Sequence, residues 1–378
     1  MKELAKCREE IDEIDAKMTA LFEERMQIAA EVAEYKRVSG KKVFDKQRED
    51  EKLEAVEQMA SNAYFGRGLR ELFSQIMSLS RKYQYTMLAD KGQSGFSRVA
   101  ALKCEAEDTV AFFGEPGSYT EQALMRALGE ECERKSCPTF AAVVEAVENG
   151  AAKYGVVPIE NTTTGDISDL YDLMAEHAVY PVAEQVIKIE HVLAAVEGAT
   201  EEGLKEVFSH PQALMQCSGY FAEHPNLLQR ACSSTSGCAL EVARSMDVTK
   251  AAIASEVAAD RYGLTVLRRG LNNQNRNSTR FFVLSKERVF TEEADKVSIC
   301  FEIAHESGSL YRILSHLIYN NLNMTKIESR PIQGKQFEYR FFVDFDGVLS
   351  EPAVQNALTG IKEEASRLKV LGCYKSFT

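Results

Sequence analysis

The chain has 378 residues, too many for one ordinary hydrophobic core, so its length predicts two or three domains. Hydrophobic residues make up 45% and charged residues 27%, which is typical of a soluble globular protein, and no apolar run is long enough to cross a bilayer. The net charge of −12 argues against a nucleic-acid partner, and an anionic ligand would need cations gathered in a pocket.

The helical pattern of the N-terminal region places polar residues on apolar faces. Residues 1–39 contain neither proline nor glycine, and the first proline is Pro116, so long uninterrupted helices can form. At about 100° per residue, one face of the first helix carries an apolar stripe of Leu4, Ile11, Ile14, Met18, Leu21, Ile28 and Val32. Arg25 and Lys36 fall within this stripe.

The second and third helices show the same feature. Glu49 shares the apolar face of the second helix, and Ser80 and Gln84 that of the third. One such residue would be interpreted as a side chain that snorkels to water or pairs with a carboxylate. Polar groups on the inward faces of all three helices favour a small internal site, and the excess of cations predicts an anionic ligand such as a dicarboxylate.

The first helix also predicts self-association. A helix of about 35 residues is roughly 50 Å long, more than a lone three-helix domain can cover, so we expect an intertwined dimer. Arg8 lies at the edge of the apolar stripe, where it is better placed to reach a neighbour's pocket than its own. A membrane-surface or partner-binding amphipathic helix is an alternative that the acidic charge disfavours.

These residues carry a resemblance to the all-helical class of chorismate mutase, over nearly all of residues 1–87. The positions that match its active-site pattern are Arg8, Arg25, Lys36, Asp45, Arg48, Glu49, Ser80 and Gln84. The resemblance implies rearrangement of chorismate to prephenate without a covalent intermediate. It further implies that arginines hold the substrate carboxylates, that Lys36 and Gln84 donate to the ether oxygen, and that Glu49 holds the hydroxyl. Arg8 would come from the partner subunit.

A polar join at residues 88–108, rich in glycine and serine over 90–95, predicts a linker. Beyond it, short apolar runs alternate with helical patterns, with strands expected at 110–113, 154–159, 251–254 and 281–284. This alternation predicts an α/β body with mainly parallel sheets. We expect the chain to cross to a second lobe near 180–196 and to return near Thr279, leaving a cleft for a ligand.

Several motifs of this body fit ordinary turns and helix caps as well as ligand sites. They are residues 114–120, 157–163, 209–212 and 233–236. The run 272–282 is more informative, because polar residues lead through Ser278, Thr279 and Arg280 into a buried apolar strand. A hydroxyl and a guanidinium at the mouth of a strand suit an anionic substrate, although a polar loop entering a strand is an equally simple interpretation.

In order and spacing these stretches resemble prephenate dehydratase over residues 109–286, with Thr279-Arg280-Phe281 as the most specific element. The resemblance implies a two-lobed fold like that of solute-binding proteins, and loss of CO2 and the ring hydroxyl to give phenylpyruvate. It makes Thr279 the essential hydroxyl, which donates to the leaving group. The implied substrate contacts are Asn161, Thr162, Gln216, Ser234, Arg280 and Phe281.

The last 85 or so residues show a βαββαβ pattern, the ferredoxin-like order, with its second helix expected at 352–368. Over residues 293–378 this resembles an ACT regulatory domain. Its first loop is matched by Gly308, Ser309 and Leu310, and its phenylalanine motif by Glu328, Ser329, Arg330 and Pro331. The resemblance implies feedback regulation by L-phenylalanine, and Ser309 and Tyr311 depart from the commonest residues of the first loop.

Cysteine and histidine usage points to no metal or redox chemistry. The nine cysteines include no C-x-x-C pair and the N-terminus lacks a secretory apolar segment, so we expect reduced thiols and a cytoplasmic location. His191 and His210 are more often structural than catalytic in such contexts. No cluster has metal-ligand spacing, and we predict neither a metal nor a cofactor.

Together these features predict a multidomain enzyme that resembles the bifunctional chorismate mutases–prephenate dehydratases of phenylalanine biosynthesis. Two alternatives stay open. A catalytically inactive amino-acid sensor is disfavoured, since a degenerate enzyme has no reason to keep Arg25, Lys36, Arg48 and Thr279. A dehydratase acting on arogenate is not excluded by sequence, because arogenate differs from prephenate at one side-chain carbonyl.

Overall fold

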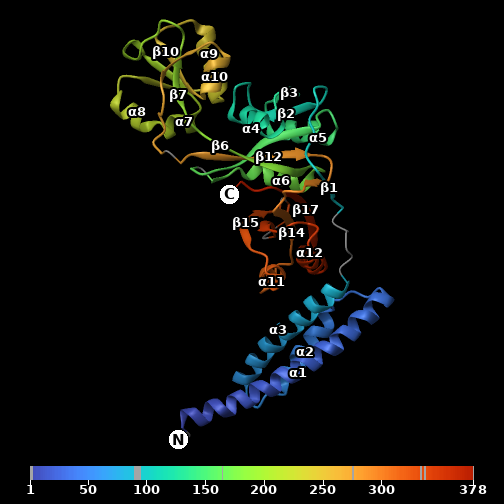
Figure 1. Cartoon of the computed structure of the whole chain (residues 1–378). Helices are drawn as coiled ribbons and strands as arrows, with labels where there is room; N and C mark the ends of the chain where they lie inside the picture. Colours follow the sequence, from blue (N-terminus) through green and yellow to red (C-terminus); the bar gives the residue numbers. More distant parts are fainter. Residues whose placement is uncertain are drawn as a thin grey trace. The chain divides into compact units, whose positions relative to one another are not determined.

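The computed structural model describes residues 3–88, 95–163, 165–274, 276–332, 334–335 and 338–377. Contacts divide the chain into two compact units, one of residues 1–95 with 299–370 and one of residues 96–298 with 371–378. Most of the expected glycine- and serine-rich join, residues 90–94, lies outside the described part. Figure 1 labels most of the helices and many of the strands of each unit.

The N-terminal region consists of α1 (Leu4–Ser39), α2 (Lys46–Gln58) and α3 (Ala63–Leu88) (Figure 1). We call these three helices the head. The first helix runs for 36 residues and ends at Gly40, whose φ of 68° closes the helix in the left-handed region. Asp45 caps α2 by accepting a hydrogen bond from the Arg48 backbone N–H.

The apolar stripe of α1 is exposed in the single chain. The helix buries only Ala29 and Ala33, whereas Leu4 is 67% exposed and Leu21 65%. The other stripe residues, Ile11, Ile14, Met18, Ile28 and Val32, are exposed as well. The shorter helices α2 and α3 cannot cover a helix of this length, so one chain leaves much of the predicted inward face open to solvent.

The C-terminal region confirms the βαββαβ order. Its elements are β14 (Lys296–Glu302), α11 (Ser309–Tyr319), β15 (Met324–Pro331), β16 (Tyr339–Asp346), α12 (Pro352–Glu364) and β17 (Arg367–Tyr374). The sheet order β15-β16-β14-β17 is that of a ferredoxin-like fold. The second helix ends at Glu364 and not at residue 368, because Ala365 is already extended and β17 begins two residues later.

The body is built on two sheets (Figure 1). In the first lobe, β3 (Glu133–Cys137), β2 (Thr109–Phe113), β4 (Tyr154–Asn161), β12 (Ser278–Ser285) and β6 (Tyr180–Lys188) lie in that order, with β5 (Gly165–Asp166) on β4. Its helices are α4 (Tyr119–Leu128), α5 (Phe140–Glu148) and α6 (Ser168–Glu176). A separate pair, β1 (Ser97–Val99) and β13 (Val289–Thr291), is parallel.

In the second lobe the strand order is β11 (Thr265–Arg268), β7 (Val192–Ala195), β10 (Lys250–Ala254), β8 (Glu206–Ser209) and β9 (Leu228–Ala231). Its helices are α7 (Pro211–Gln216), α8 (Ser218–Glu223), α9 (Thr235–Ser245) and α10 (Glu256–Arg261), with a short 3₁₀ turn at Glu201–Gly203. Small residues dominate the central strand β10, where Ala251, Ala252 and Ala254 are fully buried. They allow helices to pack closely on this sheet.

The chain crosses between the lobes where the sequence predicts, from β6 to β7 and back from β11 to β12. The expectation of mainly parallel sheets is wrong. β12 is antiparallel to both β4 and β6, and β7 is antiparallel to both β10 and β11. Because β12 returns from the second lobe, it enters the first sheet at the edge where β4 and β6 end, and it therefore runs against them.

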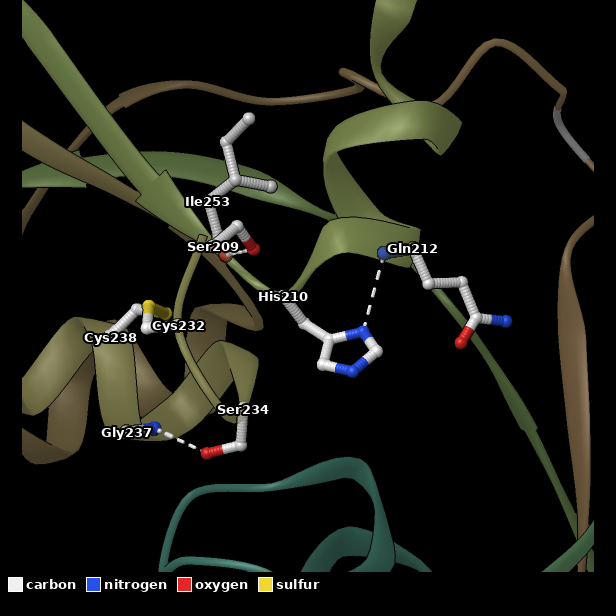
Figure 2. The surroundings of a disulfide bond; sticks show 8 residues. All are labelled: Ser209, His210, Gln212, Cys232, Ser234, Gly237, Cys238 and Ile253. Carbon is white, nitrogen blue, oxygen red and sulfur yellow. Dashed lines mark hydrogen bonds between the residues drawn. A yellow bond between two sulfur atoms is a disulfide. The ribbon is translucent and has the colours of Figure 1, made fainter. Parts of the chain in front are cut away.

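The expectation of reduced thiols is wrong for one pair of cysteines. A disulfide joins Cys232 to Cys238, whose Cα atoms are 6.1 Å apart (Figure 2). The other seven cysteines, all of them among the described residues, form no disulfide. Cys232 follows β9 and Cys238 lies in the first turns of α9. The bond thus closes a strand-to-helix turn, a proximity that depends on the fold and has no C-x-x-C signature.

Candidate active sites

The first candidate site lies where β12 enters the sheet of the first lobe. Strand register places Thr279 directly opposite Asn161 at the end of β4. Both side chains are buried, and the Asn161 amide nitrogen donates a hydrogen bond of 2.8 Å to the Thr279 hydroxyl oxygen. The same nitrogen donates to the Asn277 side-chain oxygen at 2.9 Å. This pairing fixes the Thr279 hydroxyl at the mouth of the strand.

The orientation of the Asn161 amide follows from its other neighbour. The Thr163 backbone N–H, which can only donate, lies 2.9 Å from Asn161 Oδ1, and the Thr163 hydroxyl donates to the same oxygen. The nitrogen of the amide must therefore face Thr279. Since the Thr279 oxygen accepts from this nitrogen, the Thr279 proton can be donated to a ligand.

A cavity of about 330 Å³ opens beside Thr279 and is lined by both lobes. The first lobe contributes Thr279, Asn161 and Phe281 among others. The second lobe contributes residues from two turns, and three of these, His210, Gln212 and Ser234, are drawn in Figure 2. The turns are adjacent to the disulfide, and Ser234 lies between its two cysteines in sequence (Figure 2).

Two helices begin at this cavity. Ser118 caps α4 by accepting from the Glu121 N–H, and Ser234 caps α9 by accepting from the Gly237 N–H. Both serines line the cavity, whereas none of its lining residues in the described part of the chain is arginine or lysine. Free N–H groups and the positive ends of helix dipoles favour anions. The cavity is therefore suited to an anion bound by backbone groups and hydroxyls.

The glycine-containing turn at residues 114–120 has a structural role as well. Gly117 has a φ of 84°, and a Cβ atom there would lie 2.9 Å from the Ala258 Cα of the second lobe. The Gly117 carbonyl accepts a hydrogen bond from the Ser255 hydroxyl, and the Pro116 carbonyl accepts one from the Tyr262 hydroxyl. Only glycine permits this close approach, which ties the N-terminus of α4 to the second lobe.

The second candidate site lies inside the head. Ser80 and Gln84 of α3 are buried, and Arg25 of α1 is partly buried. Among the described residues, Arg25 Nη1 and Gln84 Oε1 are buried atoms that have no hydrogen-bond partner. Burial lowers the pKa of Arg25, whereas the negative charge of Glu49 acts to raise it. Unpartnered buried polar atoms are costly, so these groups are suited to a polar ligand between the helices.

Lys36 and Glu49 complete the polar interior of the head. Burial lowers the pKa of Lys36. The negative charges of nearby carboxylates, first that of Asp45, act in the opposite direction and raise this pKa. The Lys36 ammonium donates to the Val43 carbonyl at 2.7 Å, and both Glu49 oxygens accept from Arg81. Arg81 is also a buried cation. The signal for it in the sequence is its spacing, four residues after Met77 and three before Gln84, which places it on the apolar face of α3.

A third cavity, of about 310 Å³, lies in the C-terminal region. Its lining includes Gly308, Ser309 and Leu310 of the predicted first loop. Gly308 precedes α11 with a φ of 78°, a left-handed conformation that favours glycine. The predicted residues Glu328, Ser329, Arg330 and Pro331 do not line this cavity. They lie on the edge strand β15, where Ser329 pairs with Phe341 and Pro331 with Tyr339, two residues that do line it.

Comparison with known proteins identifies the family. Residues 7–85 match the family chorismate mutase type II, and residues 110–289 match the family prephenate dehydratase. The bifunctional chorismate mutase/prephenate dehydratase of Neisseria gonorrhoeae is 32% identical, with 97% of this chain and 95% of that protein covered. The chain belongs to the bifunctional chorismate mutase/prephenate dehydratase family. It is accordingly an enzyme with both activities.

Two further proteins bear on the dehydratase region. Arogenate dehydratase 1 of Petunia hybrida is 38% identical, with 70% of this chain and 66% of that protein covered. A crystal structure of prephenate dehydratase from Arthrobacter aurescens in complex with L-Phe is similar with a TM-score of 0.67. It is 29% identical, with 71% of this chain and 90% of that chain covered.

In the dehydratase, five predicted residues meet at one cavity and two do not. Thr279, Asn161, Gln216, Ser234 and Phe281 line it. Arg280 follows Thr279 on β12, so its side chain faces the opposite side of the sheet, where it lies 3.3 Å from Glu184 and 3.4 Å from Glu160. Thr162 is exposed and donates to the Arg276 carbonyl.

A hydrogen-bonded chain of side chains that the sequence does not predict reaches the dehydratase site. The Tyr119 hydroxyl lies 3.1 Å from His191 Nδ1, and His191 Nε2 lies 3.1 Å from Gln216 Oε1. Gln216 in turn donates to the Thr163 hydroxyl. Burial lowers the pKa of His191, and the contact with Gln216 acts to raise it. His191 and His210, both expected to be structural, line the cavity, and no sequence signal separates His191 from the apolar run that contains it.

In the mutase head, three of the eight predicted residues are exposed in the single chain. They are Arg8, Asp45 and Arg48. Arg8 lies near the free N-terminal end of α1, and Arg48 is in the first turn of α2. The predicted residues that the head of one chain buries, fully or in part, are Arg25, Lys36, Glu49, Ser80 and Gln84. Asp45 is exposed but lies near enough to Lys36 to raise its pKa.

No helix of the described residues is long and apolar enough to cross a membrane. In the same part of the chain, no group of three His, Cys, Asp or Glu side chains is arranged to hold a metal ion.

Proposed function

We propose that dehydration takes place in the cavity beside Thr279, with its hydroxyl proton directed at the ring hydroxyl of prephenate. The observation that carries this role is the hydrogen bond from Asn161, which leaves the Thr279 proton available. Loss of CO2 makes the ring aromatic and supplies the driving force, so the enzyme needs to orient the substrate and stabilise the departing oxygen. A threonine hydroxyl can do this as a hydrogen-bond donor without full proton transfer.

The substrate carboxylates would be bound by the first turns of α4 and α9. Ser118 of the first lobe and Ser234 of the second lobe mark these turns, and both line the cavity. No acidic side chain lines the cavity among the described residues, so nothing there would pair with an ammonium group. Arogenate carries an ammonium group where prephenate has a carbonyl. The charge of the lining therefore favours prephenate.

The mutase reaction would take place among Arg25, Lys36, Glu49 and Gln84. Arginine is suited to bidentate contact with a carboxylate, and Arg25 presents an unpartnered Nη1. Lys36 and Gln84 would donate to the ether oxygen, on which charge develops in the transition state, and Glu49 would accept from the substrate hydroxyl. Ser80 and Asp45 would complete the substrate contacts. Holding chorismate in its compact conformer supplies much of the acceleration.

We propose that a second copy of this chain covers the exposed stripe of α1. Leu4, Leu21 and Ile28 are all more than half exposed, which is unfavourable for a monomer. A second α1 laid along the stripe would bury these residues and could bring Arg8 of the partner copy into the site. Arg48, exposed in one chain, would be enclosed in the same way.

We propose that L-phenylalanine regulates the enzyme through its C-terminal region. The similar dehydratase from Arthrobacter aurescens was solved with L-Phe bound. In this chain the cavity at Gly308 offers a glycine turn, the first turn of α11 for a carboxylate, and Phe341 and Tyr339 as apolar walls. The motif at Glu328 lies on the strand behind this wall and would act from there.

The assignment of independent sites is tested by supplying chorismate and following prephenate and phenylpyruvate. Arg25→Ala should abolish the first step and leave added prephenate turning over. Thr279→Ala should do the reverse, so that prephenate accumulates. Loss of both steps in one well-folded variant would overturn the assignment.

A further inference from the structure

Two consecutive carboxylates at the end of α12 reach the polar interior of the mutase head. Glu364 accepts a hydrogen bond of 3.0 Å from Arg81 Nε on α3, and both side chains are at most 5% exposed. Glu363, one residue earlier, accepts from the backbone N–H groups of Val43 and Phe44, at 3.0 and 3.3 Å. The C-terminal region and the head therefore share buried charged contacts.

Arg81 joins Glu364 to a proposed mutase residue. Its Nη1 lies 2.5 Å from both oxygens of Glu49, while its Nε is turned to Glu364. The guanidinium also lies 4.9 Å from the centre of the Phe44 ring. A planar group held at two edges and one face has little freedom to rotate. The direction in which Glu49 points is therefore coupled to the position of Glu364.

Glu364 is itself held in place from its own domain. His316 of α11 lies with Nε2 3.1 Å from the same Glu364 oxygen that Arg81 contacts. His316 is 1% exposed, and Gly360 of α12 leaves room for its ring, because a Cβ at that position would lie 2.4 Å from it. Glu364 Oε1 thus has two buried partners, Arg81 from the head and His316 from the C-terminal region, and displacement of either would leave a buried charge short of a contact.

Glu363 contacts the turn between α1 and α2. The Val43 backbone that donates to Glu363 also accepts, through its carbonyl, from the Lys36 ammonium at 2.7 Å. The turn before α2 is thereby fixed between a C-terminal carboxylate and the lysine proposed to donate to the ether oxygen. The Tyr85 hydroxyl also donates to Glu363, at 3.4 Å.

We infer that Arg81, anchored by Glu364 of α12, is a positioning residue for the mutase that orients Glu49 toward the hydroxyl of chorismate. Arg81 touches no reacting atom in this scheme. It fixes the carboxylate that does, and its own position depends on a residue 283 places later in the chain. The inference rests on the mutase role proposed above for Glu49.

A second pair between the same two regions provides a matched control. Lys46 of α2 lies 2.8 Å from Glu306, but both side chains are about half exposed, at 58% and 46%. Exposed pairs of this kind contribute little to stability, and this one does not contact Glu49 or Arg81. Lys46→Met therefore removes a charged contact between the regions and leaves the Arg81 contacts in place.

The test uses the full-length enzyme and measures mutase and dehydratase rates separately, with chorismate and with added prephenate. Glu364→Gln and Arg81→Met should each lower mutase kcat/KM about ten- to a hundredfold, as small misplacements of a catalytic group do. The double variant should be no slower than Arg81→Met, because both changes break one coupled contact. Arg81→Lys should restore activity only in part, and Lys46→Met should stay within about twofold of wild type.

The dehydratase rate and the thermal midpoint show whether each variant is folded. If Arg81→Met fails to fold, Glu364→Gln alone tests the positioning role of Arg81. Unchanged mutase kcat/KM in folded Glu364→Gln overturns the inference, as do multiplicative losses in the double variant or an equal loss in Lys46→Met. The Glu49→Gln variant tests the proposed mutase role of Glu49 separately from the positioning role of Arg81. If Glu49→Gln keeps full mutase activity, the proposed role of Glu49 is wrong. If Glu49→Gln loses mutase activity while the Arg81 and Glu364 variants keep it, the positioning role alone is wrong.

Discussion

The amide nitrogen of Asn161 donates to the Thr279 hydroxyl oxygen across 2.8 Å, between the end of one strand and the start of its antiparallel neighbour. Because the Thr163 N–H fixes which end of the amide faces Thr279, the hydroxyl is left with its proton to give. A serine or threonine at this place without such a neighbour could point its proton elsewhere. The pair therefore converts an ordinary hydroxyl into an oriented donor.

Removing the amide should disorient the hydroxyl. We expect Asn161→Ala to lower dehydratase kcat by about a hundredfold, the size of effect seen when one oriented donor is lost from a site. Mutase activity in the same protein should be unchanged and serves as the control. A dehydratase rate within a factor of two of wild type, measured by phenylpyruvate formation, would contradict the orienting role.

Charge placed on the exposed stripe should disrupt pairing of the heads. Leu21 is 65% exposed, and Leu21→Glu would have to bury a carboxylate against the second copy. We expect weaker self-association by light scattering after gel filtration and at least a tenfold loss of mutase kcat/KM, with dehydratase retained. Glu23→Lys, about 200° around the helix from Leu21, is the control and should change neither. An unaltered mass together with full mutase activity would count against pairing through this stripe.

Regulation should depend on the turn before α11. Gly308 has a φ of 78°, and a side chain there costs about 1–2 kcal/mol in the left-handed region. We expect L-phenylalanine to inhibit the dehydratase and Gly308→Ala to raise the half-inhibiting concentration by about fivefold or more, without changing the uninhibited rate. A flat response of wild type up to millimolar phenylalanine would contradict regulation itself. Equal inhibition of the two proteins would contradict only the location.

Acid should destabilise the dehydratase through His191. Burial lowers the pKa of His191 below its ordinary value of 6.5, so the unfolded chain binds the proton more readily than the folded one. The stabilising contribution is full above about pH 6.5 and is lost as pH falls through the lowered folded pKa. We expect the thermal midpoint to drop between pH 7.5 and 5.5, and to drop less in His191→Gln. Parallel curves for the two proteins would show that another group is responsible.

The disulfide should be detectable by counting thiols. Seven cysteines should react in denaturant before reduction and all nine after it. A bond that closes a loop with a sequence separation of 6 should contribute about 2 kcal/mol to the free energy of unfolding. Cys232→Ala/Cys238→Ala should therefore unfold at a lower temperature than the oxidised protein, whereas Cys7→Ala should not. Nine reactive thiols before reduction would show that the purified protein lacks the bond.

Local patterns in the sequence determined much of this protein. Helical periodicity placed Arg25, Lys36, Glu49, Ser80 and Gln84 on inward faces, since such patterns repeat every three to four residues. The order of strands and helices followed in the same way, including the βαββαβ tail. Alternation along a strand could also have separated Thr279 from Arg280, whose side chains face opposite sides of β12.

What remained was decided by contacts between residues far apart in the chain. His191 joins the dehydratase cavity through Tyr119, 72 positions away, and Arg81 meets Glu364 across 283 positions. Neither pairing can be predicted from hydrophobic periodicity, because periodicity indicates on which face of its own element a residue lies and not which distant residue it contacts. Strand direction and the Cys232–Cys238 bond have the same origin, since they depend on where the chain re-enters a sheet or turns into a helix. The sequence by itself determined which elements form and which faces are polar, while the tertiary structure decided which polar groups meet.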